Sequence, residues 1–512
     1  MVLDQAGVEA SPRAGRREWL GLAVLALPAL LVSVDVFVLL LALPQLSVAL
    51  GADSTQQLWI MDSYGFLLSG FMITMGTLGD RIGRRRLLLV GAAGFGVASV
   101  LAAYAPSAEM LIVARGVLGV AGATLAPSTL ALISNMFRDP RQRALAISVW
   151  LVAFVGGAAM GPLVGGVLLA NFWWGSVFLL GVPAMVLLLA VGRFLLPEYR
   201  APRAGRLDLV SVALSLAAIL PLVYALKEFA RAGAGPVAVL AGTVGAGFGV
   251  LFVRRQRRLT DPLLDLRLFR DRAFTVALVS MLFGTMLMGA IMLLITQHLQ
   301  LVEGLSPLRA GLWMLPAAAA SVVSFVVSPL LARRLAPARL IAAGLVVAVA
   351  GLVLLTQVDA RTGLSTVVTG FALINLGAGP LVTLGTDLVV GSAPPERAGA
   401  AASMNETSGE FGFAFGIAAL GSLGGLIYRQ QLTTTLPTGL PAHHAEAALE
   451  SMSGAVDVAG ALPERLGSAL LEAAGAAFTN GLHVAAGVSA VALLLVTGLV
   501  AAALRHVPPI GR

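Results

Sequence analysis

The sequence predicts an all-α membrane protein with fourteen transmembrane helices, and three observations support this prediction. Of its 512 residues, 58% are hydrophobic and only 12% are charged, whereas soluble domains carry about 25% charged residues. Its mean hydropathy is +0.92. Apolar segments long enough to cross a bilayer follow one another along nearly the whole chain. Because the sequence has no cysteine, disulfides and thiolate chemistry are excluded.

Fourteen segments have the length and apolarity of membrane spans. The apolar run that begins at Trp19 is too long for a cleavable signal peptide, so we expect it to be the first span. The segments are 19–48, 56–78, 85–105, 108–134, 143–170, 173–196, 207–230, 234–254, 273–300, 306–335, 338–358, 363–391, 397–428 and 477–505.

The distribution of basic residues supports this count. With every second loop assigned to the cytoplasm, 27 of the 34 Lys and Arg residues lie inside, as the positive-inside rule requires. Both termini are then cytoplasmic, and Lys227 falls in an outer loop. The net charge of +8 therefore reflects topology. We exclude a nucleic-acid surface because the arginines are spread over eight inner segments.

A weak internal repeat indicates two related halves. Trp59 and Trp313 each stand 21 residues before a polar turn, at Asp80 and Arg334. Two six-helix halves repeated in parallel are typical of one large transporter fold.

The predicted divisions follow from this repeat. A long acidic outer segment before the last span should form one or two short helices outside the bilayer. We expect an N-terminal six-helix half at 1–197, two extra linker helices at 198–260, a C-terminal half at 261–512, and the outer segment at 429–476.

The turn between the second and third spans combines glycine with charge. Gly79 and Gly83 bracket Asp80 and Arg81, and Arg84 begins a run of three arginines. The arginines mark a cytoplasmic helix end. We expect Asp80 and Arg81 to hold the inner ends of the two halves together while the protein faces outward.

Five acids lie inside predicted spans, where each costs roughly 2.5–3.5 kcal/mol at a helix centre. An intramembrane acid indicates a functional site, although it can also be a buried acid that pairs with a neighbouring helix. We favour a functional role for Asp35. Asp387 lies near the cytoplasmic end of its predicted span, and for it we favour a structural or gating ion pair. The five acids are Asp35, Asp62, Asp387, Glu406 and Glu410.

Glu406 and Glu410 are four residues apart, so they lie on one helix face, with the Asn405 amide beside them. Two acids on one face in a low dielectric suppress each other's ionisation. Such a pair can load and release protons near neutral pH, as a proton-coupled carrier requires. The alternative is that one of them only pairs with an arginine at the inner end.

Asp62 lies between Trp59 and Tyr64 near the outer end of the second span. A carboxylate with aromatic faces suits an organic cation, but an interfacial Trp/Tyr belt would show the same pattern. Trp313 and Phe411 are further candidates for stacking on a cation, although aromatic residues in membrane helices also face lipid.

Four motifs resemble those of the major facilitator superfamily, specifically its fourteen-helix drug:proton antiporter branch. GTLGDRIGRRR at 76–86 resembles the loop between the second and third helices. LVSVDVFVLLLALPQL at 31–46 resembles the first-helix signature of the branch, with Asp35 at its acidic position. RGVLGVAGA at 115–123 is similar to the fourth-helix arginine motif, and VGGAAMGPLVGG at 155–166 to the antiporter motif.

Within the branch, WIMDSY at 59–64 and the outer segment resemble quaternary-ammonium exporters of the QacA type. Some of those exporters have an extra acid after a Leu-Pro pair in the tenth helix. Here Leu315-Pro316 is followed by Ala317, which implies a preference for monovalent cations.

The resemblance implies a role for each matching residue. It implies that Asp35 binds substrate or protons and that Arg115 takes part in proton coupling, whereas a simple charge clamp to the first helix is the alternative for Arg115. In the antiporter motif, close packing seals or bends the interface between the halves. The matching residues here are Gly157, Gly161, Pro162 and Gly165.

The implied function is proton-coupled efflux of lipophilic organic cations by alternating access, without enzymatic activity, in the bacterial cytoplasmic membrane. The expected partners are cationic small molecules, protons and lipids, and we expect a monomer. Three alternatives stay open: a dedicated exporter of one antibiotic or metabolite, a lipid flippase of the same fold, and a non-transporting receptor. No phosphate-binding loop or metal-spaced His or Cys cluster occurs, so we expect no cofactor and no metal.

Overall fold

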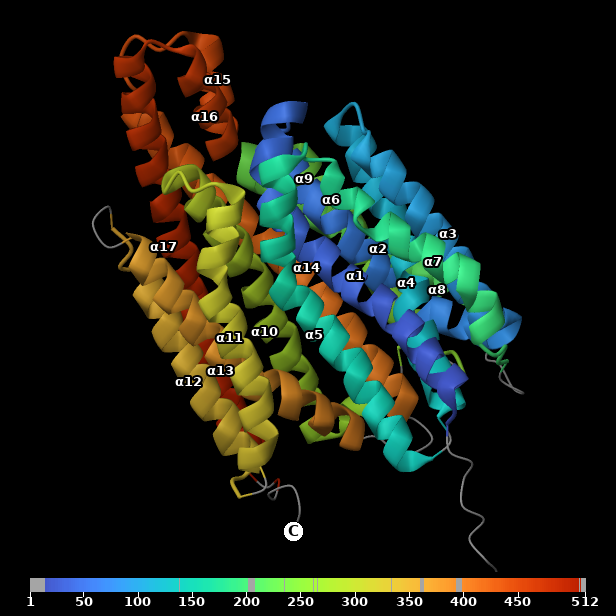
Figure 1. Cartoon of the computed structure of the whole chain (residues 1–512). Coiled ribbons are helices and arrows are strands. Elements are labelled where there is room, and N and C mark those ends of the chain that lie inside the picture. Colours follow the sequence, from blue (N-terminus) through green and yellow to red (C-terminus); the bar gives the residue numbers. More distant parts are fainter. Residues whose placement is uncertain are drawn as a thin grey trace, which may run out of the picture.

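The computed structural model describes residues 14–505 and 507, apart from 138, 201–207, 234, 261, 265, 333, 360–362 and 393–397. Within these residues the chain is helical, and its long helices run side by side as one bundle (Figure 1). The predicted all-α membrane fold is therefore confirmed.

The helices form three consecutive sets along the chain. The N-terminal group comprises α1 (Arg16–Leu50), α2 (Ser54–Ile82), α3 (Arg84–Ala103), α4 (Ala108–Met136), α5 (Pro140–Asn171), α6 (Ser176–Leu179) and α7 (Gly181–Leu195). A helical hairpin follows, formed by α8 (Leu209–Ala232) and α9 (Pro236–Gln256). The C-terminal group comprises η1 (Leu268–Arg270), α10 (Arg272–Gln297), η2 (His298–Val302), α11 (Pro307–Ala332), α12 (Pro337–Leu355), α13 (Gly363–Gly391), α14 (Ala398–Thr435), α15 (Ala442–Glu450), α16 (Met452–Ala461) and α17 (Glu464–Ala503).

Among the described residues, 13 helical stretches are long and apolar enough to cross a membrane. The fourteenth expected span corresponds to α5, of which only the shorter apolar stretches Leu145–Phe154 and Met160–Asn171 are counted. The helix itself is continuous over 32 residues. The fourteen-span topology accordingly stays a prediction.

Local sequence explains how α2 begins and ends. Asp53 caps its start by accepting a hydrogen bond from the Gln56 backbone, and the Gln56 side-chain oxygen accepts one from the Asp53 backbone N–H, which forms a capping box. Its end needs a glycine, because Gly83 has φ 113°, a value that side chains with a Cβ rarely adopt.

The segment 429–476 is more helical than expected. It contains the short helices α15 and α16, but α14 continues to Thr435 and α17 begins at Glu464. α17 therefore starts 13 residues before the predicted last span. Figure 1 shows α15 and α16 beyond one end of the bundle, beside the first turns of α17.

Each group packs mainly within itself. α1 contacts α5, α2 contacts α4, α10 contacts α14, and α12 contacts α13. The two groups meet chiefly where α2 packs on α14 and where α5 packs on α11. The α8–α9 hairpin contacts both groups, because α8 packs on α2 and on α14.

The arginine-rich end of this hairpin is held by Asp208, which caps α8 by accepting a hydrogen bond from the Ser211 backbone. Its Oδ1 also lies 2.8 Å from Nη2 of Arg255 on α9. Burial raises the pKa of Asp208, but the bonds from Arg255 and Ser211 outweigh burial and leave the pKa below its ordinary value. The charged carboxylate thus joins the two helices of the hairpin.

Candidate functional site

Asp35 and Arg115 form an ion pair inside the N-terminal group. Nη1 of Arg115 lies 2.6 Å from Oδ2 of Asp35, and the two side chains are 1% and 12% exposed. Nε of Arg115 also donates to the Ile60 carbonyl at 3.2 Å, and its guanidinium lies 4.4 Å from the Tyr64 ring centroid. The predicted charge clamp between α4 and α1 is therefore present, with the Tyr64 ring against the clamp.

Asp62 has a different counter-ion, which comes from the hairpin. Nζ of Lys227 on α8 lies 2.7 Å from Oδ2 of Asp62, and both side chains are at most 1% exposed. The same ammonium lies 3.9 Å from the centroid of the Trp59 ring. Asp62 and Trp59 do combine around a cation, but in this structure the cation is a side chain of the protein.

Thus α2 contributes to two similar units, each made of a carboxylate, a cation and an aromatic ring. Trp59 and Asp62 belong to the unit around Lys227, and Tyr64 belongs to the unit around Arg115. The WIMDSY segment supplies three of the six side chains, and α1, α4 and α8 supply the others.

Glu406 and Glu410 are half-buried on α14. They lie on the arc between Phe413, which packs against Gly289 of α10, and Ala414, which packs against Gly65 of α2. Among the described residues, neither glutamate has an ion pair or a hydrogen bond. Gly65, the residue after Tyr64, meets Ala414, and Glu410 lies one turn before Ala414 on the same face of α14. Glu410 is therefore on the face of α14 that meets α2.

Other predicted residues have structural contacts. Asn405 donates to Thr386 of α13 at 3.2 Å, and Phe411 packs against Phe66 of α2 with 5.9 Å between centroids. Trp313 is 44% exposed on α11. Asp387 is exposed; it has no ion pair with the part of the chain that the structure describes, and Arg397 lies outside that part.

The turn at 79–86 is held within the N-terminal group. Asp80 pairs with Arg84 at 2.7 Å. Arg85 pairs with Glu198, just after α7, at 3.5 Å, and the Arg85 backbone donates to the same carboxylate at 3.1 Å. No described residue of the C-terminal group pairs with Arg81 or Asp80, so the expected link between halves does not form within the part of the chain that the structure describes.

The glycine row of α5 packs on its own group. Gly157 lies against Leu30 and Ser33 of α1, and Gly165 lies against Val38 of the same helix. Gly161 is buried. Contact with the other group comes from Pro162, whose carbonyl meets Gly311 of α11. The row lets α1 approach closely, and the sealing role of the whole motif stays a prediction.

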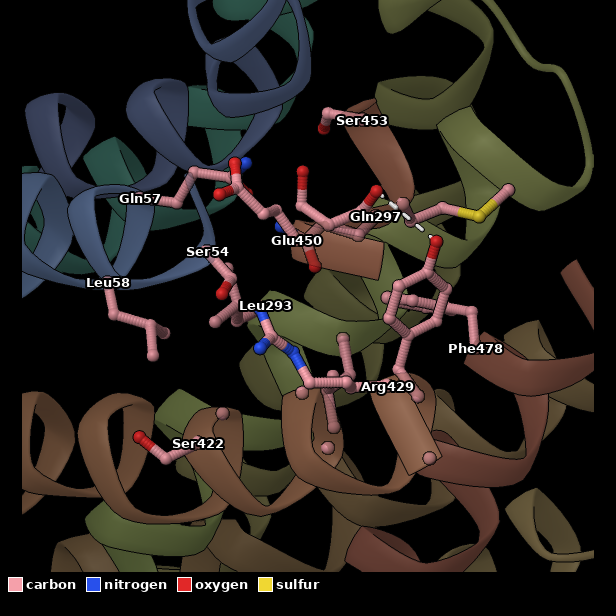
Figure 2. A pocket seen from close by; sticks show the side chains of 18 of the residues that line it. Ser54, Gln57, Leu58, Leu293, Gln297, Ser422, Arg429, Glu450, Ser453 and Phe478 are labelled. Carbon is pink, nitrogen blue, oxygen red and sulfur yellow. Dashed lines mark hydrogen bonds between the residues drawn. The ribbon is translucent and has the colours of Figure 1, made fainter. Parts of the chain in front are cut away.

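A pocket lies at the end of the bundle that carries α15 and α16. Gln57 of α2, Ser422 and Arg429 of α14, and Glu450 of α15 contribute to its wall (Figure 2), and Lys227 also lines it. None of the five intramembrane acids is among the described residues that line this pocket. Lys227 therefore both lines the pocket and pairs with Asp62.

Sequence reasoning missed two of these residues. Lys227 was expected in an outer loop, which is wrong, because α8 extends to Ala232 and buries it. The sequence distinguishes Lys227 only by its residue type, since it is the only lysine beside 33 arginines. Nothing in the sequence marks Glu198, because an acid that follows Leu-Pro and caps a helix looks the same in sequence as a solvent-exposed acid in a loop.

Comparison with known proteins agrees with this architecture. The family described as Major Facilitator Superfamily matches residues 25–417. The multidrug efflux pump LfrA of Mycolicibacterium smegmatis is 42% identical over 98% of this chain and 99% of its own length. The methyl viologen resistance protein SmvA of Salmonella typhimurium is 36% identical over 94% and 98%.

Among solved structures, a bacterial homologue of the human lysosomal transporter Spinster, described as inward-facing and unoccupied, has a TM-score of 0.67 at 16% identity. The match covers 96% of this chain and 98% of that one, and it supports the fold. The family match and the identity to full-length relatives show that this chain is a multi-pass membrane protein of the Major Facilitator Superfamily, a family of transporters and not of enzymes.

Proposed function

We propose that this protein exports lipophilic organic cations in exchange for protons. The names of the relatives support drug export, since they refer to multidrug efflux and to resistance against methyl viologen, an organic dication. Some QacA-type exporters carry an acid after the Leu-Pro pair of the tenth helix, and its absence after Leu315-Pro316 favours monovalent substrates.

The observation that carries the proposal is the pair of glutamates on α14. Glu406 and Glu410 are half-buried within a membrane helix and have no ion pair with any described residue. A buried acid without a counter-ion tends to be neutral, so it takes up a proton or a cation to avoid an uncompensated charge. Such an acid can therefore load and release the proton that antiport requires.

Alternating access would move the N-terminal half (1–197) against the C-terminal half (261–512), with 198–260 as a linker between them. Close contacts between the groups support an arrangement that is closed on one side. Leu58 meets Gly421, and Gly166 meets Leu308; both contacts lie in the helix halves away from the arginine-rich turn. With that turn and both termini in the cytoplasm, the side closed by these contacts would face the outside.

Electrostatics limits the exchange ratio. Each net charge moved outward against the membrane potential costs about 2.3 kcal/mol per 100 mV. Exchange of one monovalent cation for one proton moves no net charge.

Proteoliposomes loaded with ethidium, a monovalent cationic dye, test the proposal. An imposed pH gradient should drive ethidium transport by the wild type, and Glu410→Gln or Glu406→Gln should abolish it. Glu446→Gln, a change of an exposed acid on α15, is the matched control and should leave transport unchanged. Transport that is independent of the gradient in the wild type would contradict proton coupling.

A further inference from the structure

The inference concerns the ammonium group that α8 inserts between α2 and α14. Lys227 is the only lysine of the chain, and its side chain is buried against Asp62 and Trp59. All other basic residues are arginines, the usual choice for buried ion pairs because the guanidinium forms several fixed hydrogen bonds. An ammonium on a flexible four-carbon stem is held less firmly.

The pair has little support from neighbouring groups. Within the described chain, neither carboxylate oxygen of Asp62 and no proton of the Lys227 ammonium has a hydrogen bond of good geometry. By contrast, Arg115 donates to the Ile60 carbonyl in addition to Asp35. A buried ion pair without further hydrogen bonds gains little net stability from its burial, so the contact between Lys227 and Asp62 can be exchanged for another.

The surroundings of the ammonium have the chemistry of a binding site for organic cations. One carboxylate supplies the countercharge, and the Trp59 ring lies 3.9 Å from Nζ. An aromatic face with a carboxylate recognises quaternary and delocalised cations in the same way. The site therefore does not distinguish a lysine side chain from a small-molecule cation by charge.

Lys227 is also one of the residues that line the pocket. Leu58, Gln57 and Ser422 line it as well (Figure 2). Both Gln57 and Ser422 carry polar side chains that can receive an ammonium once it leaves Asp62. Displacement of Lys227 therefore needs no unfolding of α8.

We infer that Lys227 is a tethered stand-in for the substrate, which occupies the Asp62–Trp59 cation site when no substrate is bound and is displaced when a lipophilic monovalent cation binds. The inference rests on the proposed function. Its physical advantage is charge balance, because Asp62 is never left as an unpaired buried carboxylate when the substrate departs.

The native chain allows a direct test, because its single lysine can be labelled selectively. Purified protein in detergent is treated with formaldehyde and cyanoborohydride, and methylation of Lys227 is followed by peptide mass, which separates it from the terminal amine. Saturating tetraphenylphosphonium should accelerate methylation at least about tenfold, because a site occupied by lysine more than nine-tenths of the time becomes free. Unchanged or slower labelling in the presence of the bound probe would overturn the inference.

Equilibrium binding of tetraphenylphosphonium gives a second test. Lys227→Met removes the competitor and should tighten binding at least about tenfold, and Asp62→Asn/Lys227→Met should lose that gain while it keeps the site neutral. Equal binding by wild type and Lys227→Met, or a gain that persists in the double variant, would show that the pair is only structural. If Lys227→Met does not fold, the labelling experiment decides.

Failure of the inference and failure of the proposed function have different signatures. A wild type that binds the probe and transports it with the pH gradient, but whose Lys227 labelling ignores the probe, refutes only the inference. A wild type that binds no monovalent lipophilic cation refutes both.

Discussion

Arg115 and Asp35 meet at 2.6 Å between Nη1 and Oδ2, in a pair that links α4 to α1 and is closed on one side by the Tyr64 ring. The guanidinium is fixed by a main-chain carbonyl as well as by the acid. Release of this acid for proton or substrate binding would require a change at α2, which supplies both the carbonyl and the ring.

The first prediction concerns this pair. Arg115→Met should destabilise the protein by about 3–5 kcal/mol, because Asp35 would remain as an unpaired buried charge. Asp35→Asn/Arg115→Met removes both charges and should recover most of the loss. Thermal unfolding in detergent measures both effects. A double variant no more stable than the single one would contradict this account.

The second prediction separates coupling from stability at Glu406 and Glu410. Because neither has an ion pair with a described residue, Glu406→Gln and Glu410→Gln should keep the melting temperature of the wild type or raise it. The same variants should lose proton-driven uptake while exchange of labelled for unlabelled substrate continues. A large drop in melting temperature would indicate a partner that the acids need for folding.

The third prediction concerns Glu198. The N-terminus of α3 at Gly83 has no side-chain cap of its own, and Glu198 supplies an acceptor for the Arg85 backbone at 3.1 Å. Loss of such a cap typically costs about 0.5–2 kcal/mol. Glu198→Ala should therefore lower the melting temperature more than Glu198→Gln, which keeps an acceptor oxygen. Equal effects of the two changes would rule out the capping role.

The fourth prediction uses the absence of cysteine in the natural chain. Leu58 of α2 lies against Gly421 of α14, across the two groups, whereas Leu67 of α2 lies against Gly116 of α4 within one group. Leu58→Cys/Gly421→Cys should form a disulfide on oxidation and block transport until it is reduced. Leu67→Cys/Gly116→Cys is the matched control and should form a disulfide without blocking transport. Full activity of the oxidised first pair would exclude separation of α2 from α14 during transport.

The fifth prediction concerns pH and Asp208. Its pKa is lower in the folded protein than in the unfolded chain, so it contributes stability above its unfolded pKa of about 3.9. That contribution is lost as the pH falls through the folded value. Asp208→Asn should therefore lower the melting temperature by a constant amount at pH 5–8, and the difference should shrink below about pH 4. A difference that grows on acidification would contradict the sign of the shift.

Much of the fold could be predicted from the sequence, because lipid imposes apolar stretches of a fixed minimum length. The same argument failed at Lys227, since a lysine near a span end also fits an outer loop and only its packing against Trp59 shows otherwise. It also misplaced the start of α17, because a helix that leaves the bilayer no longer has to be apolar.

The candidate site was predictable in residue type but not in pairing. Asp35, Asp62, Glu406 and Glu410 could be identified because an acid inside a membrane helix needs a compensating role. Which acid has a counter-ion depends on the rotation of each helix, and a list of spans does not contain that rotation. Only the structure distinguishes the paired acids of the N-terminal group from the glutamates of α14.

The length of α17 has a practical consequence. At 40 residues it is about 60 Å long, roughly twice the hydrocarbon thickness of a bilayer, so it carries α15 and α16 on a stiff helical stalk. An antibody fragment raised against that stalk would stand in a defined orientation above the detergent micelle. It would give single-particle microscopy of this small transporter a reference mass for alignment.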